Sequence, residues 1–315
     1  MTGIPALKNP TADLHQAAHL MDWLALSMLN GLSHGLLLFM LSAGLTLIYS
    51  LMGVLNFAHA SFYMLGAYAA HSLSPFLGFW GALLVAPFLV GVLGAWFEEG
   101  VLRRVHAQGH VAELLVTFGL AYVAFDLVQL VWGKGPVAMV LPDSLQGHWL
   151  TPWGTQFPVF RVVMMGMAVA MLLVLAWFWR RTHWGLVVRA AVTHPQAVQA
   201  LGHNVPQVYR WVFGVGAALA AAAGVMGGHA FVTEPGMAAT MGSVVFVVLV
   251  VGGVGSLAGA FAASMGLGLL QALAIAAPWS LWGWPLSQFA PILPFALMVL
   301  VLIWRPQGLM GDRHA

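Results

Sequence analysis

Residues 239–277 read ATMGSVVFVVLVVGGVGSLAGAFAASMGLGLLQALAIAA and contain no charged side chain. A continuous helix of this length would extend about 60 Å, which is about twice the hydrocarbon thickness of a bilayer. The run therefore predicts two membrane helices rather than one. We expect the chain to fold back at its glycine-rich centre, residues 252–256.

The rest of the chain has the same apolar character. Of its 315 residues, 61% are hydrophobic and 6% are charged, whereas a soluble domain has about 25% charged residues. Only helices satisfy every backbone group in lipid when no alternating barrel pattern is present. The sequence predicts an all-α, polytopic transmembrane bundle of about eight spans, with a range of seven to nine, and the further apolar runs are 24–49, 53–74, 79–101, 111–132, 162–179, 211–232 and 290–304.

The charged residues indicate orientation rather than a nucleic-acid partner, because the net charge is only +2. Short loops that carry Lys and Arg tend to stay in the cytoplasm. Three loops are therefore expected there, and their arginines are Arg103, Arg104, Arg180, Arg181, Arg189, Arg210, Arg305 and Arg313. We expect a polar N-terminal segment (1–22), a single transmembrane domain (23–305) with a cytoplasmic loop at 180–210, and a C-terminal tail (306–315).

A weak internal repeat predicts two broken helices. Residues 53–66 read GVLNFAHASFYMLG and residues 253–266 read GVGSLAGAFAASMG, with Gly53, Gly66, Gly253 and Gly266 as candidate structural glycines. Duplicated, interrupted helices form midplane sites in many transporters. If 53–74 crosses the membrane fully, the two copies share an orientation and residues 1–22 lie outside. If 53–74 is re-entrant, the two copies are inverted and residues 1–22 lie on the cytoplasmic side. The sequence leaves both arrangements open.

Three hydrogen-bonding side chains, Asn56, His59 and Ser61, interrupt an apolar run. Polar groups at membrane depth usually face a cavity or the interior of a bundle. We interpret them, with Ser256 from the second copy, as candidates for a solute path. The alternative is a structural role, in which the same side chains form hydrogen bonds between helices.

The basic stretch 180–210 contains the signals of a short helix. Pro195 suits a first helical position, and Gly202 provides a stop. Such a helix would carry an apolar surface for a partner's groove, or it would rest on lipid headgroups. The candidate coupling residues are Arg189, Pro195, Ala197, Val198 and Leu201.

Several chemistries are disfavoured by residues that are missing. The chain has no cysteine, and its histidine pairs at 15 and 19 and at 106 and 110 have no evident third ligand, so no metal site is expected. No phosphate-binding G-x-x-x-x-G-K-[ST] motif occurs, so we expect no ATP hydrolysis and no bound cofactor. Asp126 is a candidate proton or cation site, or alternatively an interfacial carboxylate.

Six blocks of sequence, in order along the chain, resemble the H-type permeases of branched-chain amino acid ABC transporters. They are GLTLIYSLMGVLNFAHASFYMLGAYAA (44–70), ELLVTFGLAYV (113–123), VVRAAVTHPQAVQALGHN (187–204), AALAAAAGVMGG (217–228), VLVVGGVGSLAGAFAASMGLG (248–268) and WRPQGLMG (304–311). They reproduce polar positions as well as apolar ones.

The resemblance implies a multi-pass permease subunit, not an enzyme, in a bacterial inner membrane. It implies a second permease of the M type or a second copy, two cytoplasmic ATPases that use ATP and Mg²⁺, and a periplasmic binding protein. Branched-chain or other hydrophobic amino acids are the expected solutes. The family usually reads A-H-G-E where this chain has residues 58–61, so amides and urea stay open. The alternative function is a self-sufficient carrier or channel.

Overall fold

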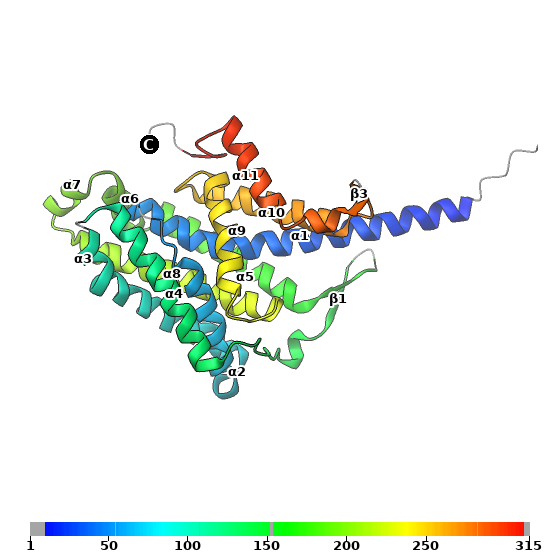
Figure 1. Ribbon diagram of the computed structural model, residues 1–315, viewed down its shortest axis with the longest axis horizontal. Helices are drawn as coiled ribbons and strands as arrows, with labels where there is room; N and C mark the ends of the chain where they lie inside the picture. Colours follow the sequence, from blue (N-terminus) through cyan, green and yellow to red (C-terminus); the bar gives the residue numbers. More distant parts are fainter. Residues whose placement is uncertain (1–9, 54, 107, 152–153, 282, 312–315) are drawn as a thin grey trace, which may run out of the picture.

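The computed structural model describes residues 10–311 except 54, 107, 152–153 and 282 (Figure 1). Parts of the expected terminal segments, 1–9 and 312–315, therefore lie outside the described residues. In chain order the elements are α1 (Pro10–Met52), α2 (His59–Phe97), the π-helical turn η1 (Glu98–Leu102), α3 (Arg103–His106), α4 (His110–Trp132), the 3-10 turn η2 (Asp143–Leu145), β1 (His148–Leu150), β2 (Gln156–Pro158), α5 (Val159–Arg181), α6 (His183–Thr193), α7 (Pro195–Ala200), α8 (Val205–Ala230), α9 (Met237–Gly252), α10 (Leu257–Ala276), β3 (Ser280–Leu281), β4 (Trp284–Pro285), the 3-10 turn η3 (Leu286–Phe289) and α11 (Leu293–Trp304).

The all-α polytopic prediction is confirmed. Among the described residues, six helical stretches are long and apolar enough to cross a membrane, and α9 and α11 are shorter apolar helices. The six are α1, α2 with its continuation to His106, α4, α5, α8 and α10. The six long stretches and the two shorter helices make eight apolar helical stretches among the described residues, which is the predicted number. Because α2 is interrupted within its length, it contains two segments, and the number of apolar helical segments becomes nine.

The chain reverses direction inside α2 at Gly78, whose φ of 67° and ψ of 177° are not helical. Glycine adopts this positive φ without the steric penalty of a side chain. Both halves of α2 then pack along α8. In the returning half, Phe79 contacts His229 near one end of α8, with ring centroids 5.0 Å apart, and Phe97 contacts Phe213 near the other, at 6.1 Å.

The first and tenth helices form a second antiparallel pair. Trp23 Nε1 donates to the carbonyl oxygen of Ala276 at 2.6 Å at one end of the pair. At the other end, Ser50 Oγ donates to the carbonyl oxygen of Gly255 at 2.8 Å. Between them, a Cβ on Gly31 would lie 2.8 Å from Leu269 Cα, so the glycine is what allows the two backbones to approach this closely.

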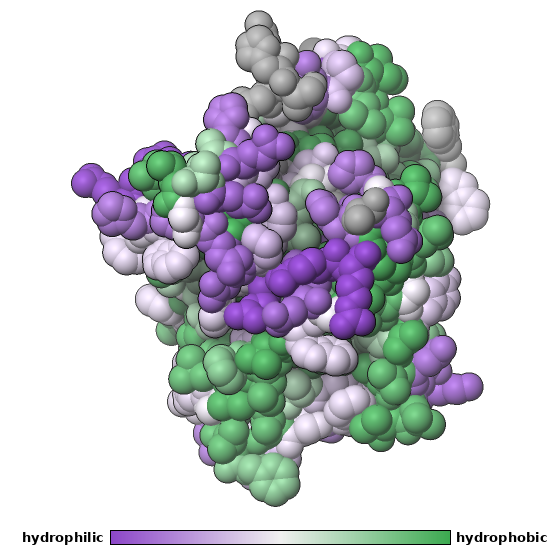
Figure 2. All heavy atoms as spheres, turned by 90° about the vertical axis from the view of Figure 1, so that its left-hand side faces the viewer, coloured by the Kyte–Doolittle hydropathy of each residue, from purple (hydrophilic) through white to green (hydrophobic). Residues whose placement is uncertain are grey.

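The bundle has two ends of different character. The basic end contains α3, α6 and α7, at the left of Figure 1. The hairpin end contains the antiparallel pairs β1–β2 and β3–β4 and the N-terminal part of α1. Figure 2 looks onto the basic end and shows hydrophilic residues gathered across its middle, bordered by apolar residues. Of the arginines expected in the cytoplasm, Arg313 lies outside the described residues.

The two breaks predicted from the repeat are present. Helix α9 ends at Gly252 and α10 begins at Leu257, which confirms the predicted fold-back. The other break lies between Met52 and His59, so it is shorter than predicted and does not reach Gly66. The helix after each break runs away from the basic end, because α10 is antiparallel to α1 and the first half of α2 runs in the same direction as α8, so the two copies share an orientation.

Candidate functional site

The break after α1 places Asn56 at the start of α2. Gly53 leaves α1 with a φ of 67°, and its amide still donates to Tyr49 O at 2.8 Å. The side-chain Oδ1 of Asn56 accepts from the amide of Ala58 at 3.0 Å, and its backbone oxygen accepts from the amide of His59 at 3.2 Å. Asparagine favours such a turn because its side chain replaces a missing backbone acceptor. The local sequence therefore ends one helix and starts the next.

The ring of His59 is fixed deep inside the bundle. Its side chain is 2% exposed, and Nε2 lies 2.9 Å from the carbonyl oxygen of Leu41, about three helical turns before α1 ends. Because a carbonyl oxygen only accepts, Nε2 is the donor and Nδ1 is left as an acceptor. Neither His59 Nδ1 nor Asn56 Nδ2 has a hydrogen-bond partner among the described residues. Two buried polar atoms at the same helix start are thus available to another group.

These residues border a cavity of about 570 Å³, a volume within the usual range for small-molecule sites. Its polar part is the break and first turn of α2, which contribute Asn56, His59 and Ser61. Its walls are mainly apolar, and none of the described residues that line it is charged. The other lining residues are Leu45, Leu55, Phe57, Ala60, Phe118, Ala121, Tyr122, Phe125, Ala238, Ala239, Gly242, Ser243, Val245, Phe246 and Phe295.

The cavity is open toward the outside of the bundle, between α4 and α9. Phe57, Phe118 and Tyr122 line it, and each is about half exposed. Phe57 also ties the break to α4, because its amide donates to Thr117 Oγ1 at 3.4 Å and its ring meets Phe118 edge to face at 6.2 Å. The cavity thus combines largely apolar walls with a few hydrogen-bonding groups, which suits a small, largely apolar solute.

The structure separates Ser256 from the other three candidate path residues. Its hydroxyl accepts from the amide of Gly259 at 3.1 Å and so caps α10 at the basic end. It does not line the cavity with Asn56, His59 and Ser61. A serine that begins a helix satisfies one of the helix's free amides, and this local role accounts for the polar residue at this position.

The four candidate glycines have different surroundings. Gly53 and Gly253 have φ values of 67° and 96°, so both provide the left-handed backbone that ends a helix. Gly66 lies inside α2, where a Cβ would collide with the backbone of Ala221 in α8. Gly266 lies inside α10, and apart from its two chain neighbours and the adjacent backbone of α10 no described heavy atom lies within 4 Å of where its Cβ would be. Its surroundings therefore give no packing reason for a glycine.

The predicted short helix is present as α7. Pro195 stands at its first position, and Gly202 follows its end with a φ of 89°. Ala197 and Leu201 are exposed, the latter at 80%, but Val198 is buried against the core. The apolar surface is thus narrower than predicted, because Val198 holds α7 to the bundle. Arg189 is exposed on the preceding helix, α6.

Two acidic residues of α4 do not line this cavity, and two residues that do line it were not predicted from the sequence. Asp126 is exposed on α4 and does not line the cavity. Glu113 is fully buried, and its carboxylate meets His106 Nδ1 and, at 3.4 Å, His110 Nδ1. Tyr122 and Ser243 line the cavity without having been predicted to do so. Their helical spacing from other lining residues indicates a shared face, but not which face borders the cavity.

Comparison with known proteins gives one family. Residues 27–302 match the family model described as the permease component of the branched-chain amino acid transport system. LivH of Escherichia coli K12, a high-affinity branched-chain amino acid transport system permease protein, is 29% identical over 90% of this chain and 94% of its own. BraD of Pseudomonas aeruginosa, with the same description, is 26% identical over the same shares. LivM of E. coli K12 is 24% identical over 86% of this chain and 67% of its own.

Proposed function

The chain belongs to the branched-chain amino acid transport permease family, and on this basis we propose that it is the H-type membrane subunit of an ABC importer in a bacterial inner membrane. The observation that supports this most directly is the cavity at the start of α2. It brings Asn56, His59 and Ser61 together inside an otherwise apolar bundle. In this proposal the cavity is part of the route taken by the solute.

A second permease completes the route. The cavity opens between α4 and α9 on the outer surface of the bundle, where lipid would otherwise meet the polar groups of the break. Leaving polar groups against hydrocarbon is costly, at about 1 to 3 kcal/mol each by mutational estimates. The similarity of this chain to LivM as well as to LivH supports an M-type partner. A second copy of this chain is the alternative partner.

The lining of the cavity suits branched-chain or other hydrophobic amino acids. A zwitterion has no net charge, and the described lining residues provide no charged partner for a cationic or anionic solute. Apolar walls bury the hydrocarbon side chain, at about 25 cal/mol per Å² of apolar surface. Small amides and urea are also neutral, but they would leave most of the apolar wall without a contact.

The two ends of the bundle serve different partners in this proposal. The arginine-rich basic end faces the cytoplasm, as short basic loops do. There α6 and α7 present Arg189, Ala197 and Leu201 to two ATPases, which bind ATP and Mg²⁺. The hairpin end faces the periplasm, where a binding protein delivers the solute.

The substitution Asn56→Leu tests the cavity as the route. It removes the unpartnered amide with little change in volume, so leucine uptake by the assembled transporter should fall about tenfold, as expected for one lost hydrogen bond to a charged group. Uptake is measured in proteoliposomes with binding protein, ATP and radiolabelled leucine. Ser256→Ala is the control, because its cap lies outside the cavity and uptake should persist.

Two results would contradict this assignment. If Asn56→Leu assembled normally and transported leucine at the parental rate, the cavity would not be the route. If the variant failed to assemble, the role of Asn56 would be structural, through the bond that it accepts from Ala58 at the start of α2. Faster uptake of an amide or of urea than of leucine by the parental complex would change the substrate but keep the transport function.

A further inference from the structure

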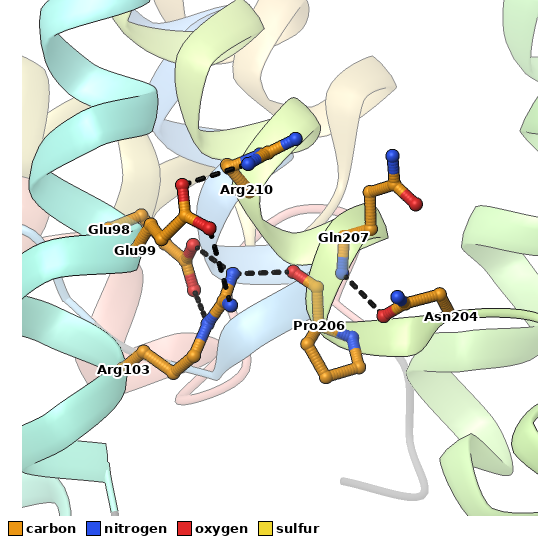
Figure 3. Close-up of polar contacts among 7 residues, drawn as sticks. All are labelled: Glu98, Glu99, Arg103, Asn204, Pro206, Gln207 and Arg210. Carbon is orange, nitrogen blue, oxygen red and sulfur yellow. Dashed lines mark hydrogen bonds and ion pairs between the residues drawn. The ribbon is translucent and has the colours of Figure 1, made fainter.

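A cluster of four charged residues joins α8 to the end of α2 at the basic end (Figure 3). Arg103 forms two bonds with Glu98, from Nη2 to Oε2 at 2.8 Å and from Nε to Oε1 at 3.4 Å. The same Nη2 donates to the carbonyl oxygen of Pro206, in the first turn of α8, at 2.9 Å. A single guanidinium thus holds a carboxylate of η1 and a backbone carbonyl of another helix.

A second pair lies beside the first. Arg210 Nη1, one turn further along α8, donates to Glu99 Oε2 at 2.8 Å. Arg103 Nη1 also approaches Glu99 Oε1 at 4.0 Å, so the two pairs form one network. The side chain of Glu98 is 1% exposed, whereas those of Glu99 and Arg210 are 47% and 30% exposed.

The cluster lies along the connection from α7, the helix proposed to contact the ATPases, to the cavity. Helix α7 leads into α8 through the short linker 201–204, in which the amide of His203 donates back to Val198 O at 3.2 Å and Asn204 Oδ1 caps α8 by accepting from the amide of Gln207 at 3.1 Å. The cluster continues this connection from α8 to η1, at the end of α2. Helix α2 in turn begins at the cavity, and both of its halves pack on α8.

The ion pair between Glu99 and Arg210, called the outer pair below, is expected to contribute little to the stability of the fold. Half-exposed ion pairs contribute little to folding, because solvent screens them and two long side chains must be ordered. Glu99 lies in a π-helical turn, a feature that occurs often at functional sites. The pair joins α8, the helix that follows α7 along the chain, to η1 at the end of α2.

We propose that Glu99 and Arg210, together with Arg103 and Glu98, are positioning residues that transmit movement of α7 to α2 and so to the cavity. None of the four lines the cavity, so their effect is on coupling and not on solute contact. This inference rests on the proposed function, in which ATPases displace α7. It predicts that loss of the outer pair separates ATP hydrolysis from transport.

The test measures leucine transported per ATP hydrolysed by the complete transporter in proteoliposomes. Glu99→Arg and Arg210→Glu each place two like charges together, and each should lower this ratio about fivefold or more, the lower limit of typical coupling between sites. Complex yield and maximal ATP hydrolysis should stay close to parental. The double exchange Glu99→Arg with Arg210→Glu restores an opposite pair and should recover most of the ratio.

Arg104→Glu is the matched control. It makes the same charge change as Arg210→Glu, but on α3, and Arg104 takes part in none of the ion pairs among the described residues. The ratio of leucine transported to ATP hydrolysed should therefore be unchanged in this variant. Arg103 is not substituted, because Glu98 would be left as a buried, unpaired charge. Single variants with a parental ratio, or a double variant without recovery, would overturn the coupling role. Failure of the parental complex to transport leucine with ATP would overturn the proposed function itself.

Discussion

At the scale of single residues, position in the backbone decides what a polar side chain does. Asn56 and Ser256 both begin a helix after a break, and both accept a backbone amide hydrogen. Asn56 has a second polar atom, the amide nitrogen, which has no partner among the described residues. The side chain of Ser256 has only one polar heavy atom, Oγ, and this atom accepts the hydrogen bond that caps α10. The residue that retains an unused polar atom is the one beside the cavity.

The two glycines at equivalent positions of the repeat provide a paired test of packing. Gly66→Ala should destabilise the protein by about 1 to 3 kcal/mol, because its Cβ would meet the backbone of Ala221 and force α2 away from α8. Gly266→Ala should be neutral or stabilising by up to about 1 kcal/mol, because alanine favours helix and the site is open. Thermal unfolding in detergent measures both.

If Gly66→Ala unfolded at the parental temperature, the close approach of α2 and α8 would not contribute to stability. The different surroundings of the two glycines also show what the sequence could not predict. Both glycines fall in matching motifs of the repeat, and only the packing of α2 on α8 distinguishes them. Residue type and spacing identify candidates, but the partner across a helix interface is set by the whole fold.

At the scale of elements, helices were largely predictable because apolar run length is fixed by bilayer thickness. The fold-back at 252–256 and the separate runs 53–74 and 79–101 agree with α9, α10 and the two halves of α2. Helix α1, in contrast, starts at Pro10, within the segment predicted only as polar. Hydropathy detects apolar runs, so it gives no signal where a helix continues through polar residues.

The short helix α7 permits a prediction about docking. Ala197→Glu places a charge on its exposed surface, so transport should be lost and the ATPases should no longer copurify, because an unpaired charge in a partner interface costs several kcal/mol. The chain itself should stay in the membrane at normal yield. Val198→Glu is the contrast, since Val198 is buried and this change should lower the yield of folded protein. Normal copurification and transport by Ala197→Glu would remove α7 from the interface.

At the scale of the whole molecule, the chain has an arginine-rich end and an end with two β-hairpins, and α1 begins at the latter (Figure 1). Both copies of the repeat point the same way in this geometry. If the basic end lies in the cytoplasm, as we propose, the start of α1 lies on the periplasmic side.

The absence of native cysteines makes this orientation directly measurable. A membrane-impermeant thiol reagent should label Asp22→Cys and Gln146→Cys, at the hairpin end, in intact spheroplasts. It should label Gln196→Cys, in α7 at the basic end, only after the membrane is permeabilised. The reverse pattern would show that the basic end faces outward, against the positive-inside rule.

The central claim is that the cavity beside Asn56 carries the solute between two permeases, and thiol modification of Ser243→Cys in the complete transporter tests it most directly. Ser243 lines the cavity from α9. A small charged reagent should reach this cysteine, block leucine uptake and react more slowly when binding protein, leucine and ATP are present. Leu173→Cys, on an exposed apolar part of α5, is the control and should not react. Reaction of Ser243→Cys without loss of uptake, or with no protection by leucine, would contradict the claim.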